Sequence, residues 1–380
     1  MVGLRSSPGS REAHDRDSPP ARQGVGPQAD IGGRSLNNFS EPYVPDPASS
    51  SSAATGAGRP APAIPTPLDV VYICGAHRSG ATVLGALLAA RPEVFFWGEA
   101  YRYPRPMFWP GNMVWPKDPT RGCSCGVPAD QCPFWTAVRA ELEQRAPFLE
   151  NLERGQRTYE SWSALPTRLG SALRHDPALD AHVQRMVEFL RVIAARTEAR
   201  VLAESSYSAM RGSLYRRAEL AGGRVRFVHL VRDGRNFLAS ELGVLWDPER
   251  PARWVRSRTV IVARWVVYNL AAILIGVRDP RSYLRVRYED LVLRPAETLA
   301  KIGAFLDLDL SDVARRVAAR EAIPMRHIAA GNRARLRGSV VLRGDLAGLP
   351  QLPRSTSALF WALGGWLALL LGYRPGTPVR

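Results

Sequence analysis

Lysine is nearly absent from this sequence, although the chain is strongly basic. The formal net charge is +16, yet arginine supplies all but two of the 51 cationic side chains, the exceptions being Lys117 and Lys301. The arginines are spread along the chain and accompany no nucleic-acid-binding motif, so nucleic acid is not the expected partner. Because the planar guanidinium can bond two oxygens of a phosphate or sulfate, a small anionic ligand is the better prediction.

Cysteine is also scarce, which excludes a secreted scaffold held together by disulfides. Four cysteines in 380 residues are too few for such a fold, so a reducing, cytoplasmic compartment is expected. Residues 1–67 lack the apolar stretch of a secretory signal. They are rich in Pro, Gly, Ser and Ala without apolar periodicity, and we predict a disordered tail there. A single domain is expected over residues 68–373, followed by a short tail at 374–380.

Short apolar runs that alternate with helical patterns indicate an α/β fold. The predicted strands are residues 70–74, 94–97, 201–203, 227–231 and 283–286. Helices are predicted near residues 82–90, 136–150, 179–199, 209–221, 235–245 and 254–277. This alternation predicts a P-loop-type parallel sheet with helices on both faces. Such sheets bind ligands at the carboxyl ends of their strands, which directs attention to residues 75–82, 98–100, 204–208 and 232–240.

The turn after the first predicted strand resembles a phosphate-binding loop that has lost its lysine. Residues 75–82 have the two-glycine spacing and the threonine of a Walker A loop, but Ala81 stands where an NTPase has lysine. The positive charge is instead that of Arg78, inside the loop. Glycines let consecutive backbone N–H groups converge on an anion, and the helix that begins near Thr82 adds its positive end. The turn therefore suits a phosphate but not an ordinary ATPase.

A second anion site is predicted after the fourth strand, where Arg232 ends the strand and Ser240 lies on the next helix. With the loop, this segment resembles the sulfotransferases that use 3′-phosphoadenosine-5′-phosphosulfate (PAPS), particularly the bacterial group related to carbohydrate and tyrosylprotein sulfotransferases. The family's phosphosulfate loop matches residues 78–82 and its 3′-phosphate motif matches residues 230–240. Further similarity lies at 288–291, 331–335 and 371–373. The resemblance implies that PAPS is bound by Arg78, Ser79, Gly80, Ala81, Thr82, Arg232 and Ser240.

Sulfuryl transfer needs a base for the acceptor and positive charge for the leaving phosphate. The resemblance implies that Glu99 is the base, that Arg78 stabilises the leaving phosphate, and that Arg335 reaches PAPS from a C-terminal loop. The alternatives are a surface acid for Glu99 and a solvated basic segment for Arg335. Related bacterial sequences have a lysine where this chain has Tyr207, and Arg211 is the candidate substitute.

No metal is expected to be required for this chemistry. Three cysteines and a tryptophan nevertheless form a cluster in the sequence: Cys123, Cys125, Cys132 and Trp135. Three thiols can bind zinc if a fourth ligand comes from elsewhere, and two can pair under oxidation, but a structural role of this region is preferred. His77, His229 and His327 do not have the spacing of metal ligands and are expected to be structural.

The uncharged run at residues 355–373 is slightly short for a membrane span. It is predicted to pack on the domain, with peripheral membrane contact as the alternative. The acceptor pocket is expected in the loops 101–170 and 243–258.

Three functions compete. The first is sulfuryl transfer from PAPS to a hydroxyl or amine of a carbohydrate, lipid or small metabolite. The second is a P-loop kinase for a small substrate, against which Ala81 argues. The third is a catalytically weak nucleotide-binding protein, which Tyr207 motivates.

Overall fold

The computed structural model describes residues 67–99, 122–145, 147–160, 167, 176–218, 220, 222–245, 251–343, 346 and 352–375. The side chains at 243–245, 251–257 and 333 lie outside this description. So does the predicted tail at 1–67 except for Pro67. Residues 101–121, 146, 161–166, 168–170 and 246–250 of the predicted acceptor loops also lie outside it.

Five parallel strands form the central sheet, in the order β2-β3-β1-β4-β5. They are β1 (Asp69–Cys74), β2 (Val94–Phe96), β3 (Val201–Glu204), β4 (Val225–Val231) and β5 (Tyr283–Arg287). All five predicted strands are confirmed, with ends that differ by two residues or fewer. The central strand, β1, pairs Val71 with Ala203 on one side and with Arg226 on the other. The carboxyl ends of β1 and β4 are therefore neighbours, which is where the two predicted anion sites meet.

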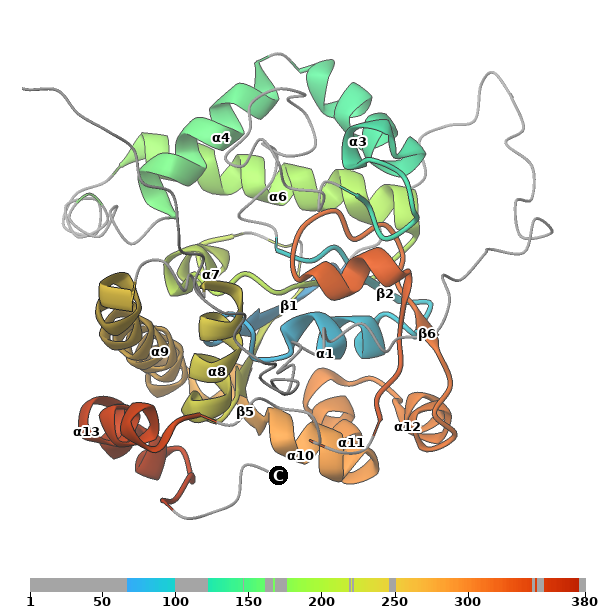
Figure 1. The fold of residues 1–380 in the computed structure, drawn as a ribbon. Coiled ribbons are helices and arrows are strands. Elements are labelled where there is room, and N and C mark those ends of the chain that lie inside the picture. The colour runs from blue at the N-terminus through green and yellow to red at the C-terminus, as the bar shows by residue number, and fades with distance from the viewer. Residues whose placement is uncertain are drawn as a thin grey trace, which may run out of the picture. The chain divides into compact units, whose positions relative to one another are not determined.

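Helices cover both faces of the sheet (Figure 1), as predicted for an α/β fold. One face carries α3 (Pro133–Glu143), α4 (Phe148–Tyr159), α6 (Pro177–Thr197) and α7 (Ala209–Tyr215). The other carries α1 (Ala81–Leu88), α10 (Tyr288–Leu293), α11 (Pro295–Leu306) and α12 (Ser311–Ala318). A third group packs together from α8 (Gly234–Leu245), α9 (Pro251–Arg278) and α13 (Arg354–Leu370). Outside the sheet lies a short antiparallel pair, β6 (Ile323–Pro324) and β7 (Ser339–Val340).

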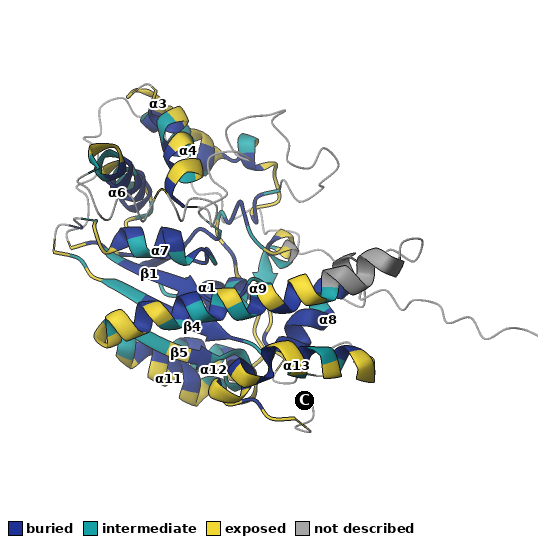
Figure 2. Cartoon of the chain, turned by 90° about the vertical axis from the view of Figure 1, so that its left-hand side faces the viewer, coloured by how far each residue is buried: buried dark blue, intermediate teal, exposed yellow. Residues whose placement is uncertain are grey.

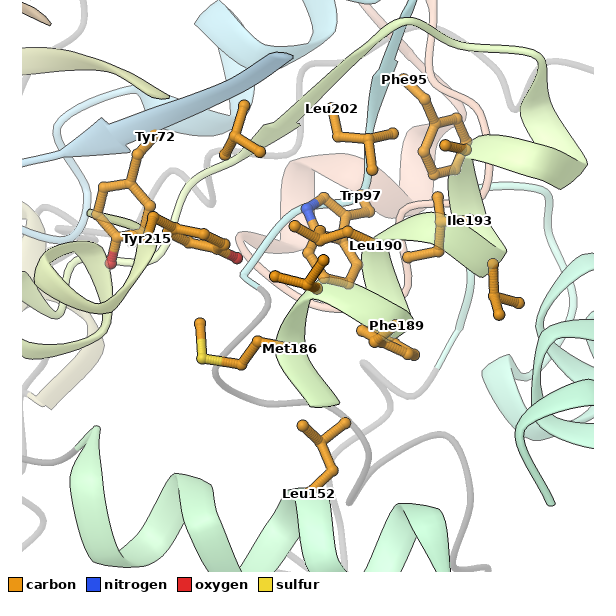
Figure 3. Packing of buried hydrophobic residues seen from close by; sticks show 14 of the residues in the cluster. Tyr72, Phe95, Trp97, Leu152, Met186, Phe189, Leu190, Ile193, Leu202 and Tyr215 are labelled. Atoms are coloured by element: carbon orange, nitrogen blue, oxygen red, sulfur yellow. The ribbon is translucent and has the colours of Figure 1, made fainter. Parts of the chain in front are cut away.

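The strands are apolar on both faces because successive side chains point to opposite sides of the sheet. In β1, Val70 and Tyr72 face α6 and α7, whereas Val71 and Ile73 face α1 and α11. Figure 3 shows the first of these faces, where side chains of β1, β2 and β3 pack against α6 and where the ring of Tyr72 lies 5.8 Å from that of Tyr215. Figure 2 shows that the strands are buried between helices, and that the outer surfaces of these helices are exposed. This packing holds the strand ends, and thus the site, in fixed positions.

Two predicted helices are wrong in their extent: the helix predicted at 209–221 ends at Tyr215, and the helix predicted at 136–150 is interrupted near a proline. Residues 136–150 were expected to form a single helix, but α3 ends at Glu143 and α4 begins at Phe148. Pro147 lies between them and lacks the N–H that would continue the α3 hydrogen-bond ladder. The longer α6 agrees with its prediction, because the Asp176 side chain accepts hydrogen bonds from the backbone of Ala178 and so caps the helix.

Two apolar helices bear on the alternative of peripheral membrane contact. Within α9, the stretch Arg258–Arg278 is long and apolar enough to span a membrane, but 44% of an apolar 18-residue segment of it is buried in the protein. A core helix of a soluble fold meets the same criteria, so α9 is weak support for a span. The run at 355–373 forms α13, which packs on α9 as predicted, with Phe360 and Leu367 buried and Trp366 and Leu370 exposed.

Candidate functional site

The predicted phosphate loop connects β1 to α1 at the carboxyl edge of the sheet. Positive φ angles at Gly75 (123°), Arg78 (61°) and Gly80 (96°) turn the backbone through the loop. Gly80 is the N-cap of α1, so the positive end of the helix faces the loop. A side chain on Gly80 would meet the Tyr288 ring at 2.3 Å, so only glycine fits there. The turn holds all the predicted loop residues: Arg78, Ser79, Gly80, Ala81 and Thr82.

The second predicted anion site contacts this loop directly. Arg78 Nε donates a hydrogen bond to Ser240 Oγ of α8 at 2.8 Å, and Arg232 Nη1 donates to the Arg78 carbonyl at 2.9 Å. The guanidinium of Arg232 also stacks on Tyr288, 4.9 Å from the ring centroid. Its Nε is buried and has no hydrogen-bond partner among the residues that the structure describes. A buried donor of this kind fits a site for an anionic oxygen.

Glu241 is part of this site, although no sequence motif indicated it. Its carboxylate lies 3.2 Å from Arg78 Nε and 3.0 Å from His77 Nε2. Burial raises the pKa of Glu241, but the hydrogen bond and charge of His77, together with the charge of Arg78, outweigh burial and lower the pKa overall. The carboxylate is therefore ionised and orients the Arg78 guanidinium. Its position next to Ser240 is the only clue in the sequence.

His229 forms the floor beneath the loop. A side chain on Gly75 would come within 2.7 Å of the Leu230 carbonyl and 3.1 Å of the His229 ring, so the loop backbone rests on the end of β4. His229 Nδ1 lies 2.6 Å from the Tyr283 hydroxyl and Nε2 lies 2.9 Å from Asn269 Oδ1. Burial lowers the pKa of His229 to about 4. The ring is a neutral structural element, as predicted.

The segments at 288–291 and 371–373, which added to the family resemblance, brace the second motif. Glu289 Oε1 accepts a hydrogen bond from the Asp233 backbone N–H at 2.9 Å. Glu289 Oε2 accepts one from the Tyr373 hydroxyl, also at 2.9 Å. Burial raises the pKa of Glu289. The carboxyl group thus joins three distant segments directly behind Arg232.

Glu99, the predicted base, follows β2 and lies next to the first turn of α1. Its backbone N–H donates to the Ala330 carbonyl at 3.2 Å, and Gly98 forms an isolated parallel bridge with Ala330. A Cβ atom on Gly331 would lie 3.7 Å from both Glu99 Cγ and Thr82 Oγ1. The fold therefore brings the predicted base beside the phosphate loop, with the 330–331 backbone between them.

Arg335 holds the turn that carries Gly331. It is 2% exposed and its Nη1 donates to the carbonyls of Gly331 at 2.7 Å and Asn332 at 3.3 Å. The surrounding residues Arg333–Arg337 form a short 3-10 helix, which Asn332 caps by accepting from the Ala334 N–H. The alternative of a solvated basic segment is thus wrong for Arg335, because its side chain is buried. Its contact with PAPS remains a prediction.

Tyr207 occupies the place of the expected lysine and forms an aromatic wall beside the loop. Its ring centroid lies 5.3 Å from that of His77 and 5.3 Å from that of Tyr268. His77 also contacts Phe237 edge-on at 5.1 Å. Tyr207 carries no positive charge where a lysine is expected. Positive charge comes instead from Arg78, within the loop, and from Arg232, which bonds the Arg78 carbonyl.

Arg211 does not substitute for that lysine, because it is committed to a buried ion-pair network. The side chain is 2% exposed. Its Nε lies 2.9 Å from Glu204 Oε1 and its Nη1 lies 2.7 Å from Glu160 Oε1. The Tyr215 hydroxyl accepts a further hydrogen bond from Nη2 at 2.9 Å. The expectation of Arg211 as a second cation is therefore corrected: its guanidinium bridges two buried carboxylates.

The three predicted cysteines converge with His327, which the sequence spacing did not predict as a partner. One ligand atom from each of Cys123, Cys125, Cys132 and His327 lies within 4.8 Å of the others. The expectation that His327 has no metal-ligand arrangement fails because the fold brings it 195 residues back along the chain to Cys132.

Comparison with protein families finds a match within the chain. A family model described as the sulfotransferase family matches residues 149–312, which include β3, β4 and the motif at 230–240. Over these residues the chain is similar to the sulfotransferase family. The phosphate loop and Glu99 lie before the matched residues. The chain has no match among the curated proteins.

Solved sulfotransferase structures are similar to this chain at low sequence identity. The sulfotransferase domain of the Synechococcus PCC 7002 olefin synthase is 17% identical with a TM-score of 0.43, over 80% of this chain and 97% of that one. The sulfotransferase domain of the curacin biosynthetic pathway is 16% identical with a TM-score of 0.42, over 81% and 98%. Sulfotransferase STF9 of Mycobacterium avium is 12% identical with a TM-score of 0.43, over 82% and 78%.

Proposed function

We propose that the protein transfers a sulfuryl group from PAPS to a hydroxyl or amine of a carbohydrate, lipid or small-metabolite acceptor. The observation that carries the proposal is the junction of the two anion sites, where Arg78 bonds Ser240 and Arg232 bonds the Arg78 carbonyl. A donor with a 5′-phosphosulfate and a separate 3′-phosphate needs two such sites side by side. Ala81 in place of lysine favours this donor over ATP.

Different residues would bind the two ends of the nucleotide. The loop backbone, Ser79 and Thr82 would hold the phosphosulfate, and Arg232 with Ser240 would hold the 3′-phosphate. When bound, PAPS supplies a sulfuryl group whose bond to the 5′-phosphate breaks as the acceptor oxygen or nitrogen bonds to sulfur. Arg78 is placed to neutralise negative charge at the loop, and Glu241 fixes its orientation.

Glu99 would take the proton of the acceptor. Glu99 Cγ and Thr82 Oγ1 each lie 3.7 Å from the position that a Cβ on Gly331 would take, so an acceptor bound beside the loop would also be close to Glu99. General-base catalysis of this kind contributes about 100- to 10,000-fold to a rate. The chemistry requires no metal at this position. Peripheral membrane contact through residues 355–373, where Trp366 and Leu370 are exposed, remains a prediction for a lipid acceptor.

A second candidate function is nucleotide binding with weak turnover. It is favoured by Tyr207, which packs between His77 and Tyr268 where a lysine is expected, and by the burial of Arg211. Incubation with labelled PAPS and an extract of acceptors separates the candidates. A transferase yields labelled product that Glu99→Gln abolishes, whereas a weak binder retains the nucleotide without product. In either case Tyr207→Lys tests whether the missing charge limits turnover.

Thermal unfolding with nucleotides tests the donor without knowledge of the acceptor. Adenosine 3′,5′-bisphosphate should raise the unfolding temperature of the protein, because it carries both phosphates of the donor. ATP with Mg²⁺ is the control, and stronger stabilisation by ATP would overturn the proposal in favour of a kinase.

A further inference from the structure

Cys123, Cys125, Cys132 and His327 form a compact group of four ligand atoms outside the proposed catalytic site. All four atoms lie within 4.8 Å of one another. Cys125 Sγ is 3.6 Å from Cys132 Sγ, and Cys132 Sγ is 3.3 Å from His327 Nδ1. Around a tetrahedral zinc ion, sulfur–sulfur distances of about 3.8 Å and sulfur–nitrogen distances of about 3.6 Å follow from the usual bond lengths. The separations of 3.6 Å and 3.3 Å are within about 0.3 Å of these values, whereas a disulfide requires about 2.05 Å.

The local backbone presents the thiols in one direction. Cys123 N–H donates to the Val127 carbonyl at 2.7 Å and Gly126 N–H donates to the Cys123 carbonyl at 3.0 Å, which closes a tight turn around Cys125. Gly126 has a φ of 92°, as such a turn requires. Cys132 is the N-cap of α3, whose positive end stabilises a thiolate. Three sulfurs are thus fixed by one short segment.

His327 is held in place by contacts that leave its ring against the sulfurs. Its φ of 50° lies in the left-handed region, which costs a non-glycine residue about 1–2 kcal/mol. Trp135 Nε1 donates to its carbonyl at 2.7 Å, and the Phe134 ring stacks on the imidazole at 5.0 Å and 14°. Strained backbone that is fixed by its surroundings is typical of a functional position.

We propose that these four residues bind one structural zinc ion, which fastens the C-terminal strap (residues 325–335) beside Glu99. A closed set of three thiolates and one imidazole is characteristic of structural zinc sites, with no position left for a reacting water. The strap leaves the cluster at His327 and reaches Ala330, whose carbonyl accepts from the Glu99 N–H. Zinc would therefore act on the site by positioning Gly331 and Arg335.

Further contacts beside the cluster show how the metal would transmit this order. Ser124, between two of the ligands, donates from its backbone N–H to the Ile328 carbonyl at 3.0 Å. Its hydroxyl accepts from the Ile328 N–H at 2.9 Å and donates to the Met325 carbonyl at 3.1 Å. The two segments are thus cross-linked on both sides of His327.

Elemental analysis of the full-length protein, with any affinity tag removed, tests the metal. Wild-type protein should carry about one zinc per chain. Cys132→Ser should lose most of it, and Cys74→Ser is the matched control, since Cys74 is a buried free cysteine outside the cluster. If Cys132→Ser does not fold, His327→Gln serves instead and should bind zinc roughly tenfold or more weakly in a chelator competition. Folded wild-type protein that contains no zinc and takes up none on titration would overturn the proposal, as would iron in its place or equal loss in Cys74→Ser.

Hydrogen exchange tests the positioning role without any measurement of sulfuryl transfer. Removal of zinc by a chelator should speed exchange of the Ile328 and Arg335 backbone amides, while amides of β4 keep their protection. Unchanged exchange in the strap would overturn the positioning role. Because neither measurement depends on PAPS or on an acceptor, its failure is distinguishable from failure of the proposed function.

Discussion

The proposed site has two ends: a nucleotide end at Arg78 and Arg232, and an acceptor end at Glu99. The residues of the nucleotide end follow adjacent strands of one sheet. The acceptor end is formed by segments that are joined by a few isolated contacts. Arg78 and Arg232 follow β1 and β4, which pair along their length. Glu99 follows the edge strand β2 and meets the strap through the single bridge from Gly98 to Ala330. The first arrangement is set by the sheet itself. The second depends on how firmly the strap is held, so the proposed zinc ion would affect the acceptor end.

The largest expected effect is at the acceptor end, on catalysis. Glu99→Gln should reduce turnover about 100- to 10,000-fold, because it removes the base while leaving the shape of the side chain. Affinity for adenosine 3′,5′-bisphosphate should not change, since the nucleotide end is intact. The measurements are product formation from labelled PAPS and calorimetric binding.

Glu93→Gln is the matched control, because Glu93 lies just before β2 and pairs with Arg91 at 3.2 Å, away from the loop. Equal turnover in wild type and Glu99→Gln would contradict the assignment of Glu99.

The stability of the protein should depend on Arg211. Arg211→Met should lower the free energy of unfolding by about 3–5 kcal/mol, because the Glu160 and Glu204 carboxylates are left buried without their cation. Arg217→Met is the control: Arg217 pairs with Asp180 at 2.6 Å on the surface, and its loss should cost about 0–1 kcal/mol. Denaturant unfolding measures both. A stable Arg211→Met protein that has lost only turnover would restore the catalytic role rejected above.

At the nucleotide end, the protonation of His229 should make stability depend on pH. The pKa of His229 is lowered by burial from 6.5 to about 4 in the folded protein. Between these values the unfolded chain binds the proton and the folded protein does not, so stability rises with pH from about 4 to 6.5. The difference of about 2.5 pKa units corresponds to about 3 kcal/mol.

Denaturant unfolding across this pH range should show the rise, and His229→Gln should flatten it. An equally steep rise in His229→Gln would contradict the neutral, buried histidine.

The smallest expected change in stability concerns the loop glycines. Gly80→Ala and Gly222→Ala both place a side chain at positive φ, 96° and 85°, and this backbone strain alone costs about 1–2 kcal/mol each, to which the contact with Tyr288 adds in Gly80→Ala. Only Gly80→Ala should also lose adenosine 3′,5′-bisphosphate binding, because its new methyl group meets the Tyr288 ring at 2.3 Å, whereas the nearest atom to that of Gly222→Ala is 4.0 Å away. Thermal unfolding with and without the nucleotide measures both effects. Retained binding in Gly80→Ala would show that the loop tolerates displacement.

The nucleotide end could be predicted from the sequence because its residues lie in short motifs next to apolar strands. The strand pattern gives the parallel sheet, and the rule that ligands bind at carboxyl ends of strands selects Arg78 and Arg232. The sequence did not indicate α10, α11 and α12 or the role of Glu289, whose contacts to Asp233 and Tyr373 join distant segments. Local periodicity carries no information about such pairings.

The acceptor end was predictable only in part. Glu99 was reached through family resemblance, and its contact with the 330–331 backbone depends on tertiary packing. The sequence does not indicate the ion pairs of Arg211, because its buried partner Glu160 lies 51 residues away along the chain. The sequence does not indicate His327 as a partner of the cysteines, because ligands from distant segments leave no spacing pattern.

The most direct test of the account is calorimetric titration of wild type and Arg232→Ala with adenosine 3′,5′-bisphosphate. The account predicts one site per chain in wild type and binding weakened by about 10- to 150-fold in the variant, the loss expected for hydrogen bonds to a charged group. Binding of the same strength in both proteins, or tighter binding of ATP with Mg²⁺ by wild type, would contradict the proposal that the joined anion sites hold a PAPS-type donor.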